Sequence, residues 1–272
     1  FTYNYDDNGN LTKKILKTQP TQQTNYVYDA ENQLTGIQSP TASAQYRYDG
    51  LGRRIEKAVG ANITRYIYDN EDILLEYNGN NTLQTDYIHG PGIDEPLVME
   101  RGGQSYFYHG DGLGSITDLT NSGGSIVQSY VYDSFGNIVT QNGSLTNPYT
   151  YTGREFDPES GLYYYRARYY DAKIGRFLQH DPILSPMSLT NVTLSQSDNK
   201  MVWLLPYFIG NPEFLRPYIY IGNDPLNHRD PTGLHGFMLF GRQPFIFRYP
   251  GVNRLAPSQR YIPPRSTKQC PI

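Results

Sequence analysis

The stretch YTYTGREFDPESGLYYYRARYYDAKIGRFLQHDP (residues 149–182) decides the fold of this chain. Its aromatic residues recur in a Tyr-x-Tyr pattern, which places two rings on one face of a β-strand. Two breaks, at 157–161 and 171–175, begin with Asp and end with Gly, as is typical of tight turns in which glycine takes a positive φ. The stretch therefore predicts a run of short, aromatic antiparallel strands. Its charged residues are expected on the opposite face or as partners in a polar seam: Arg154, Glu155, Arg166 and Arg168.

A Tyr-x-Tyr-Asp motif repeats along the chain before this stretch. Intact copies begin at positions 3, 26, 46, 66 and 130, and degenerate copies begin at 87, 106 and 149, so neighbouring copies lie 19 to 24 residues apart. Tyr-x-Tyr ends a strand, Asp opens a turn by bonding to its own backbone, and a following Gly closes that turn. Because a lone hairpin is marginal, successive hairpins have to stack side by side. The repeat predicts a long, twisting antiparallel sheet, whereas a β-propeller would have periods nearer about 40 residues.

The quoted stretch resembles the core signature of the RHS-repeat (YD-repeat) family. The segment YFYHGDGLGSITDLTNSGGSIVQSYVYDSFGN (106–137) resembles the part of that core just upstream, and the resemblance resumes at YIYIGNDPLNHRDPTGL (218–234). The resemblance implies an all-β fold in which tandem antiparallel hairpins form a spiralling sheet. That sheet is part of a hollow shell, one end of which the core signature closes.

The same resemblance divides the chain into five parts. They are the YD/RHS repeats (1–105), the RHS-associated core (106–182), an irregular insertion (183–217), a closing strand with the motif Asp-Pro-Thr-Gly-Leu (218–234) and a variable, basic, Pro-rich tail (235–272). For the insertion, a surface loop anchored around Trp203 and a lid or plug on the shell mouth both remain open.

Composition excludes several classes of protein. The chain has 26 Tyr, whereas a disordered chain would lack aromatic residues. It has a single Cys, which excludes an internal disulfide and a cysteine-based zinc site. No run of 18 apolar residues is present, so no membrane span is expected. The five His lack metal-binding spacing, and HGDGLGS (109–115) lacks the Gly-Lys-Ser/Thr ending of a phosphate loop, so we expect no metal, no cofactor and a simple turn.

Charge is distributed unevenly along the chain. The net charge of −3 indicates no nucleic-acid partner for the shell. Residues 235–272 hold five Arg, one Lys and no acid, a charge of +6, which leaves −3 − 6 = −9 for residues 1–234. An acidic body and a basic tail fit a retained cargo, although a solvated end explains the same charge.

Self-cleavage by paired aspartates is the chemistry that the resemblance implies. One carboxylate takes a proton from water while the other protonates the carbonyl of a peptide bond. By resemblance, the pair is Asp181 and Asp230, the cut bond is Leu234–His235, and Arg176 holds the substrate carbonyl or a carboxylate. Asp-Pro at a strand end is also a common turn opener, so a purely structural role stays open.

Two functions from different classes follow. The first is a shell fragment of a secreted polymorphic toxin, in which the partners are the chain's own C-terminal tail or effector and further repeats upstream. The second is a structural or adhesive cell-surface scaffold without catalysis, whose tyrosine faces contact carbohydrate or protein. The chain starts inside a repeat, with no initial Met and no signal-like segment, so we expect a C-terminal piece of a longer protein that is secreted or on the cell surface.

Overall fold

The computed structural model describes residues 1–182, 217–234 and 237–238. Apart from single turns of 3-10 helix, its regular elements are antiparallel strands, as the repeats predict. The strands are β1 (Thr2–Tyr5), β2 (Leu11–Ile15), β3 (Gln23–Tyr28), β4 (Leu34–Gln38), β5 (Ser43–Tyr48), β6 (Arg54–Val59), β7 (Asn62–Asp69), β8 (Asp72–Asn78), β9 (Leu83–His89), β10 (Pro96–Arg101), β11 (Gln104–Gly110), β12 (Ile116–Asn121), β13 (Ile126–Tyr132), β14 (Ile138–Asn142), β15 (Glu155–Asp157), β16 (Leu162–Tyr165), β17 (Arg168–Asp171), β18 (Arg176–Phe177), β19 (His228–Arg229) and β20 (Phe237–Met238). The short helical turns are η1 (Tyr151–Gly153) and η4 (Ile221–Asn223).

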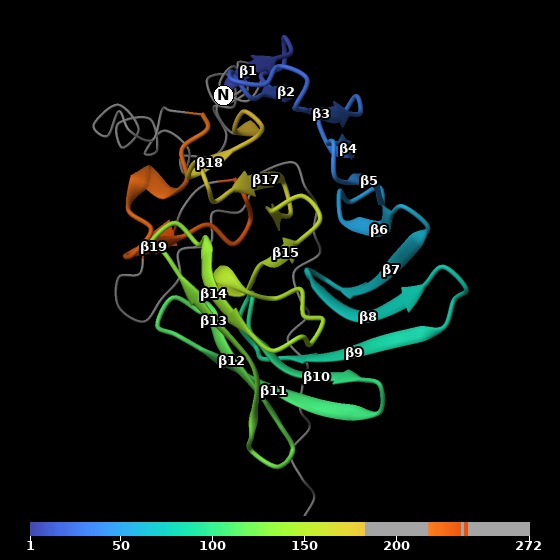
Figure 1. The fold of residues 1–272 in the computed structure, drawn as a ribbon. Helices are drawn as coiled ribbons and strands as arrows, with labels where there is room; N and C mark the ends of the chain where they lie inside the picture. The colour runs from blue at the N-terminus through green and yellow to red at the C-terminus, as the bar shows by residue number, and fades with distance from the viewer. Residues whose placement is uncertain (183–216, 235–236, 239–272) are drawn as a thin grey trace, which may run out of the picture.

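Strands β1 to β14 form one sheet, which we call the wall. Each strand of the wall pairs with its neighbour in sequence, in the order β1 to β14. The wall curls around the small sheet β15–β18, which lies inside the curve (Figure 1). The spiralling sheet of tandem hairpins expected from the sequence is therefore confirmed.

The tyrosine repeat sets which face of the wall points inward. In β3, the ring of Tyr26 is buried at 7% exposure, while the next residue, Val27, is 57% exposed. The same alternation holds at Tyr87 and Ile88 in β9, where the exposed fractions are 1% and 53%. Because side chains alternate across a strand, the tyrosines line the concave side and the residue after each one faces out.

The turns of the repeat follow the predicted chemistry. Asp133 Oδ1 accepts hydrogen bonds from the backbone N–H groups of Phe135 at 2.9 Å and Asn137 at 3.0 Å, and Gly136 between them has a φ of +89°. The same bonding pattern occurs at four other aspartates: Asp6, Asp29, Asp49 and Asp111. The turn at Asp111 includes the glycine-rich HGDGLGS, which is thus a structural turn.

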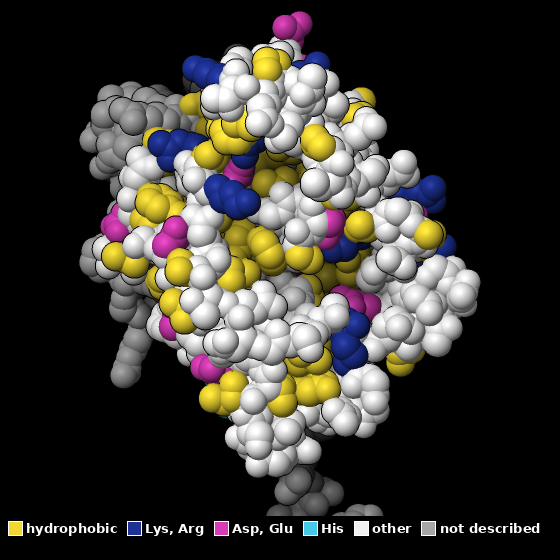
Figure 2. Space-filling model, in the orientation of Figure 1, with side chains coloured by type: hydrophobic (Ala, Val, Ile, Leu, Met, Phe, Trp, Pro, Cys, Tyr) yellow, Lys and Arg dark blue, Asp and Glu magenta, His cyan; other side chains and the backbone are white. Residues whose placement is uncertain are grey.

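The small sheet β15–β18, which we call the core sheet, is buried on both faces. Tyr164 and Tyr169 pack against the wall strands β2 to β5. We call residues 217–234 the returning segment. On the other face of the core sheet, Tyr163, Tyr165 and Tyr170 pack against Tyr220 of this segment. In Figure 2, hydrophobic side chains gather in the middle of the face shown, with acidic and basic side chains beside them. Because both faces of the core sheet are covered, its charged residues Arg154, Glu155 and Arg168 are buried and pair with charges of opposite sign. They correspond to the polar seam expected from the sequence.

Core tyrosines bond to the turns of the wall. Tyr163 Oη donates to the carbonyl of Gly136 at 2.7 Å, and Tyr170 Oη donates to the carbonyl of Phe135 at 2.9 Å. Tyr164 Oη donates to the carbonyl of Gly52 at 3.3 Å. The repeated turns therefore both connect the strands of the wall and bind the core sheet.

The five divisions drawn from the sequence remain predictions. Most of the insertion 183–217, its Trp203 included, and most of the tail 235–272 lie outside the described residues. Over the part of the chain that the structure describes, no helix is long and apolar enough to cross a membrane.

Candidate functional site

The structure brings together the two aspartates singled out in the sequence. Asp181 follows the core sheet and Asp230 follows β19, and their exposed fractions are 3% and 1%. Nη2 of Arg168 lies 3.0 Å from Oδ2 of Asp181 and 3.3 Å from Oδ2 of Asp230. Two buried carboxylates therefore share one guanidinium group.

Arg168 is held by contacts on several sides. Its guanidinium lies over the ring of Phe177, 3.6 Å from the ring centroid, a position in which the ring's negative face attracts a cation. Nη1 donates a hydrogen bond to the carbonyl of Pro217 at 3.1 Å, and Nε donates to the carbonyl of Gly233. The sequence predicts Arg168 on the opposite strand face or in a polar seam, and it does not predict the position of Arg168 between the two aspartates. A buried pair of carboxylates requires a cation nearby, and this requirement could have pointed to an arginine of the core sheet.

Asp230 also contacts the residue before the predicted cut. Its Oδ1 accepts a hydrogen bond from the backbone N–H of Leu234 at 3.2 Å and from Thr232 Oγ1 at 3.3 Å. Asp230 thus bonds to the turn that it opens, as the structural interpretation expects. The same carboxylate lies beside the residue that precedes the predicted cut, as the catalytic interpretation expects. The other residue of that bond, His235, lies outside the described residues.

Arg176 makes different contacts from those that the resemblance implies. Its Nη1 donates to the carbonyl of Gly175 and to Asn223 Oδ1, each at 2.8 Å. Its backbone bridges to Ile219 in the returning segment. A role for Arg176 in holding a carboxylate or a substrate carbonyl stays a prediction.

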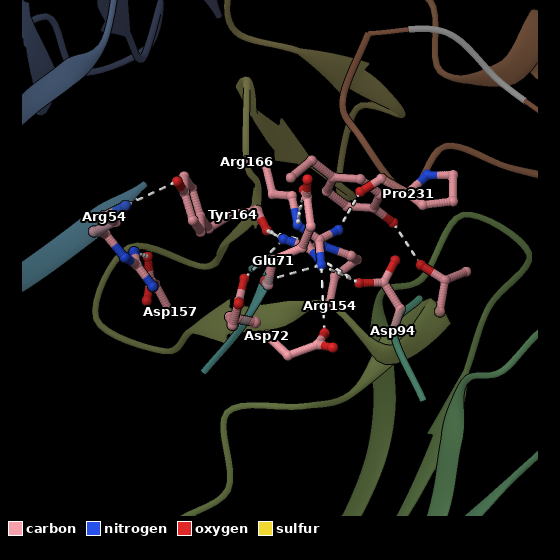
Figure 3. A network of polar contacts seen from close by, with 12 residues as sticks. Arg54, Glu71, Asp72, Asp94, Arg154, Asp157, Tyr164, Arg166 and Pro231 are labelled. Carbon is pink, nitrogen blue, oxygen red and sulfur yellow. Dashed lines mark hydrogen bonds and ion pairs between the residues drawn. The ribbon is translucent and has the colours of Figure 1, made fainter. Parts of the chain in front are cut away.

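A second arginine, Arg166, joins the Asp-Pro-Thr-Gly-Leu segment to the wall (Figure 3). Its Nη1 donates to the carbonyl of Pro231. Its Nη2 lies 2.9 Å from Oδ1 of Asp94, and its Nε lies 3.4 Å from Oε2 of Glu71. Asp94 and Glu71 lie in connections between wall strands, so the wall supplies the acids that hold this arginine.

Asp94 is the centre of this network. Arg154 Nη1 lies 2.6 Å from the same Oδ1 atom, so two guanidinium groups face one carboxylate. Burial acts to raise the pKa of Asp94, but the charges of Arg154 and Arg166 outweigh it and hold that pKa below its ordinary value. Asp94 is therefore ionised at neutral pH.

A parallel network lies at the other end of β15 (Figure 3). Asp157 Oδ2 lies 2.5 Å from Arg54 Nη1, and its Oδ1 lies 2.8 Å from Lys57 Nζ. Burial acts to raise the pKa of Asp157, but the two wall cations lower it below its ordinary value. Both networks join charged residues of the core to oppositely charged residues of the wall.

The described residues offer no obvious metal centre. Within 1–182, 217–234 and 237–238, no three His, Cys, Asp or Glu side chains are grouped as metal ligands.

Comparison with known proteins places these features in a family context. The family model described as the teneurin YD-shell matches residues 1–203. The tRNA3(Ser)-specific nuclease WapA of Bacillus spizizenii is 36% identical over 65% of the chain, and salivary gland surface protein 1 of Aedes aegypti is 32% identical over 84%. The chain spans only 8% and 6% of the length of these two relatives. Two further bacterial relatives are named as toxins.

A solved structure shares the fold. The Photorhabdus luminescens Tc holotoxin pore superposes on 89% of this chain with a TM-score of 0.55 and 20% sequence identity. The match covers 13% of that other chain. At this identity the likeness concerns the fold alone.

Proposed function

This chain belongs to the teneurin YD-shell family, and we propose that it is the closing part of a toxin-type shell that cuts its own chain at Leu234–His235. The segment beyond the cut, enclosed by this shell and by further repeats of the same protein, is the partner. The protein acts after secretion or on the cell surface.

One observation carries the proposal: two buried carboxylates meet at one arginine beside the Asp-Pro-Thr-Gly-Leu segment. In the proposed reaction, one of Asp181 and Asp230 takes a proton from water and the other gives a proton to the carbonyl of Leu234. The water oxygen bonds to the carbonyl carbon, and the C–N bond to His235 breaks as the departing nitrogen takes up a proton. Each molecule cuts once, because the substrate is part of the same chain.

Replacing Asp230 by Asn tests this reaction. The wild-type chain, folded at neutral pH, is expected to give two masses that correspond to a break after Leu234. Asp230→Asn is expected to give one intact mass, because an amide does not accept and return the proton. Intact-mass spectrometry measures both.

Asp224→Asn is the matched control. Asp224 lies in the same returning segment, but its side chain is 46% exposed and its partner is His228. This variant is expected to cut like the wild type. Cutting that continues at the normal rate in Asp230→Asn would remove Asp230 from the mechanism.

A surface scaffold without catalysis is the second candidate function. The relative from Aedes aegypti is named as a surface protein, and the convex face of the wall exposes apolar residues such as Val27, Ile88 and Val131. The tyrosine faces expected to make these contacts are buried on the concave side of the wall. In this function, the apolar residues of the outer face therefore contact carbohydrate or protein at a cell surface. A single uncut mass for the wild-type chain, together with binding to cell surfaces, would favour it.

A further inference from the structure

Three successive residues of the core contact three successive carbonyl groups of the predicted cleavage segment. Arg166 Nη1 donates to the carbonyl of Pro231, and Arg168 Nε donates to the carbonyl of Gly233. Between them, the backbone N–H of Ala167 donates to the carbonyl of Thr232 at 3.3 Å. All three contacts are made to backbone atoms, so they fix the path of the segment independently of its side chains.

Gly233 is the one position at which a side chain would disturb this path. Its φ is +69°, in the left-handed region that favours glycine. A Cβ atom at this position would overlap the carbonyl oxygen of Tyr165 and would lie 3.2 Å from the backbone nitrogen of Arg168. The close approach of the two backbones therefore requires glycine.

Arg166 connects these contacts to the wall. Besides Pro231, it contacts Asp94 at 2.9 Å and Glu71 at 3.4 Å, which come from two different connections of the wall. Arg166 is therefore held in place only when these connections have folded.

We propose that Arg166, Ala167 and Arg168 form a backbone-binding cradle that positions residues 231–233 for cutting, and that Arg166 and Arg168 are its positioning residues. The cradle takes a peptide with glycine immediately before the leucine at the cut. This inference rests on the proposed self-cleavage. It adds why the cut segment needs glycine before leucine, and why cutting requires a folded wall.

The physical reason is orientation. A reaction between two parts of one chain is fast only when the reacting atoms are held in the correct geometry. Arg168 contacts the carbonyl of Gly233 and both carboxylates at once, so one side chain sets the distance between the segment and the acid–base pair. A lysine keeps the charge, but its compact ammonium group lacks the planar array of donors that makes these contacts together.

Arg168→Lys in the full-length chain tests the cradle. Cutting, followed as the fraction of intact mass over time, is expected to slow by about 100-fold, the scale found when one oriented donor is removed from an active site. Arg47→Lys is the matched control, because the Arg47 side chain is 76% exposed on the wall. Gly233→Ala is expected to slow cutting as well, since its Cβ would push the segment out of the cradle.

A second measurement separates this inference from the proposed reaction. In an Asp181→Asn background the chain is expected to stay intact, and hydrogen exchange then reports whether the segment is bound. Adding Arg168→Lys is expected to speed exchange of the Leu234 and Ala167 amides, while adding Arg47→Lys is not. This readout works even if the wild-type chain proves uncut.

The outcomes divide clearly. Slower cutting together with faster exchange supports the cradle. Normal cutting in Arg168→Lys overturns it and leaves self-cleavage standing. Slower cutting with unchanged exchange also overturns it, because Arg168 would then act on the chemistry alone. An uncut wild type overturns the proposed function, and the exchange data then decide the cradle independently.

Discussion

Buried arginines join the wall and the core sheet at the scale of single residues. Arg54, Arg154 and Arg168 are each at most 2% exposed, and each lies against a carboxylate and an aromatic ring. Removing a charge from water is costly, and a close partner of opposite charge offsets that cost. The tyrosine-rich interior supplies ring faces on which the guanidinium groups pack.

Arg54→Met tests this arrangement. It is expected to lower the free energy of unfolding by about 3–5 kcal/mol, because the buried Asp157 loses its closest partner. Arg47→Met, whose side chain is 76% exposed and lies 3.5 Å from Glu56, is expected to change it by less than about 1 kcal/mol. Urea unfolding measures both variants, and equal effects would contradict the account.

The repeated turn is the feature that matters at the scale of elements. An aspartate bonds to two backbone N–H groups, and a residue with positive φ ends the turn. The residue at that position is Gly136 in one copy and Asn32, with a φ of +62°, in another. Asparagine tolerates the left-handed region better than most residues, so the turn survives without glycine.

Gly136→Ala is expected to be more destabilising than Gly124→Ala. Both glycines have positive φ, but a Cβ on Gly136 would overlap the ring of Tyr151, whereas a Cβ on Gly124 meets nothing within 4 Å. Gly124→Ala should cost about 1–2 kcal/mol from backbone strain alone. Gly136→Ala should cost about 1–3 kcal/mol more from overpacking. Thermal unfolding of the two variants checks this difference.

The turns could be predicted from sequence because their causes are local. Asp133 and Gly136 lie within one short segment, and the alternation of Tyr26 and Val27 across the sheet follows from the pleat of a single strand. The place of Arg168 could not be predicted in the same way. Arg168 meets Asp181 and Asp230 only because the returning segment brings Asp230 back to the core sheet. The sequence between the two aspartates has no repeat from which that path could be predicted.

The whole molecule is a wall folded around a core, joined by ion pairs that respond to pH. Asp94 and Asp157 both have pKa values below the ordinary carboxyl value in the folded state. A lowered pKa means that the folded state favours the ionised form. Its contribution to stability is full above the unfolded value of about 3.9 and is lost as the pH falls through the folded pKa.

Stability is therefore expected to fall as the pH drops below about 4. Urea unfolding at a series of pH values measures the free energy of unfolding in the wild type and in Asp157→Asn. The variant is expected to be less stable at neutral pH and to lose less stability on acidification, because one of the responsible carboxylates is gone. An identical loss in both proteins would show that Asp157 does not contribute to the acid response.

The topology also sets an order in time. Every wall strand pairs with its neighbour in the sequence, so hairpins can assemble one after another as the chain leaves the ribosome. The core sheet makes contacts between residues far apart in the sequence, such as Lys14 and Asp171, which are 157 positions apart. The carboxylate pair needs Asp230 as well, so it is completed after the wall has been synthesised. If the proposed cut takes place, translation itself delays it until the wall strands have been made.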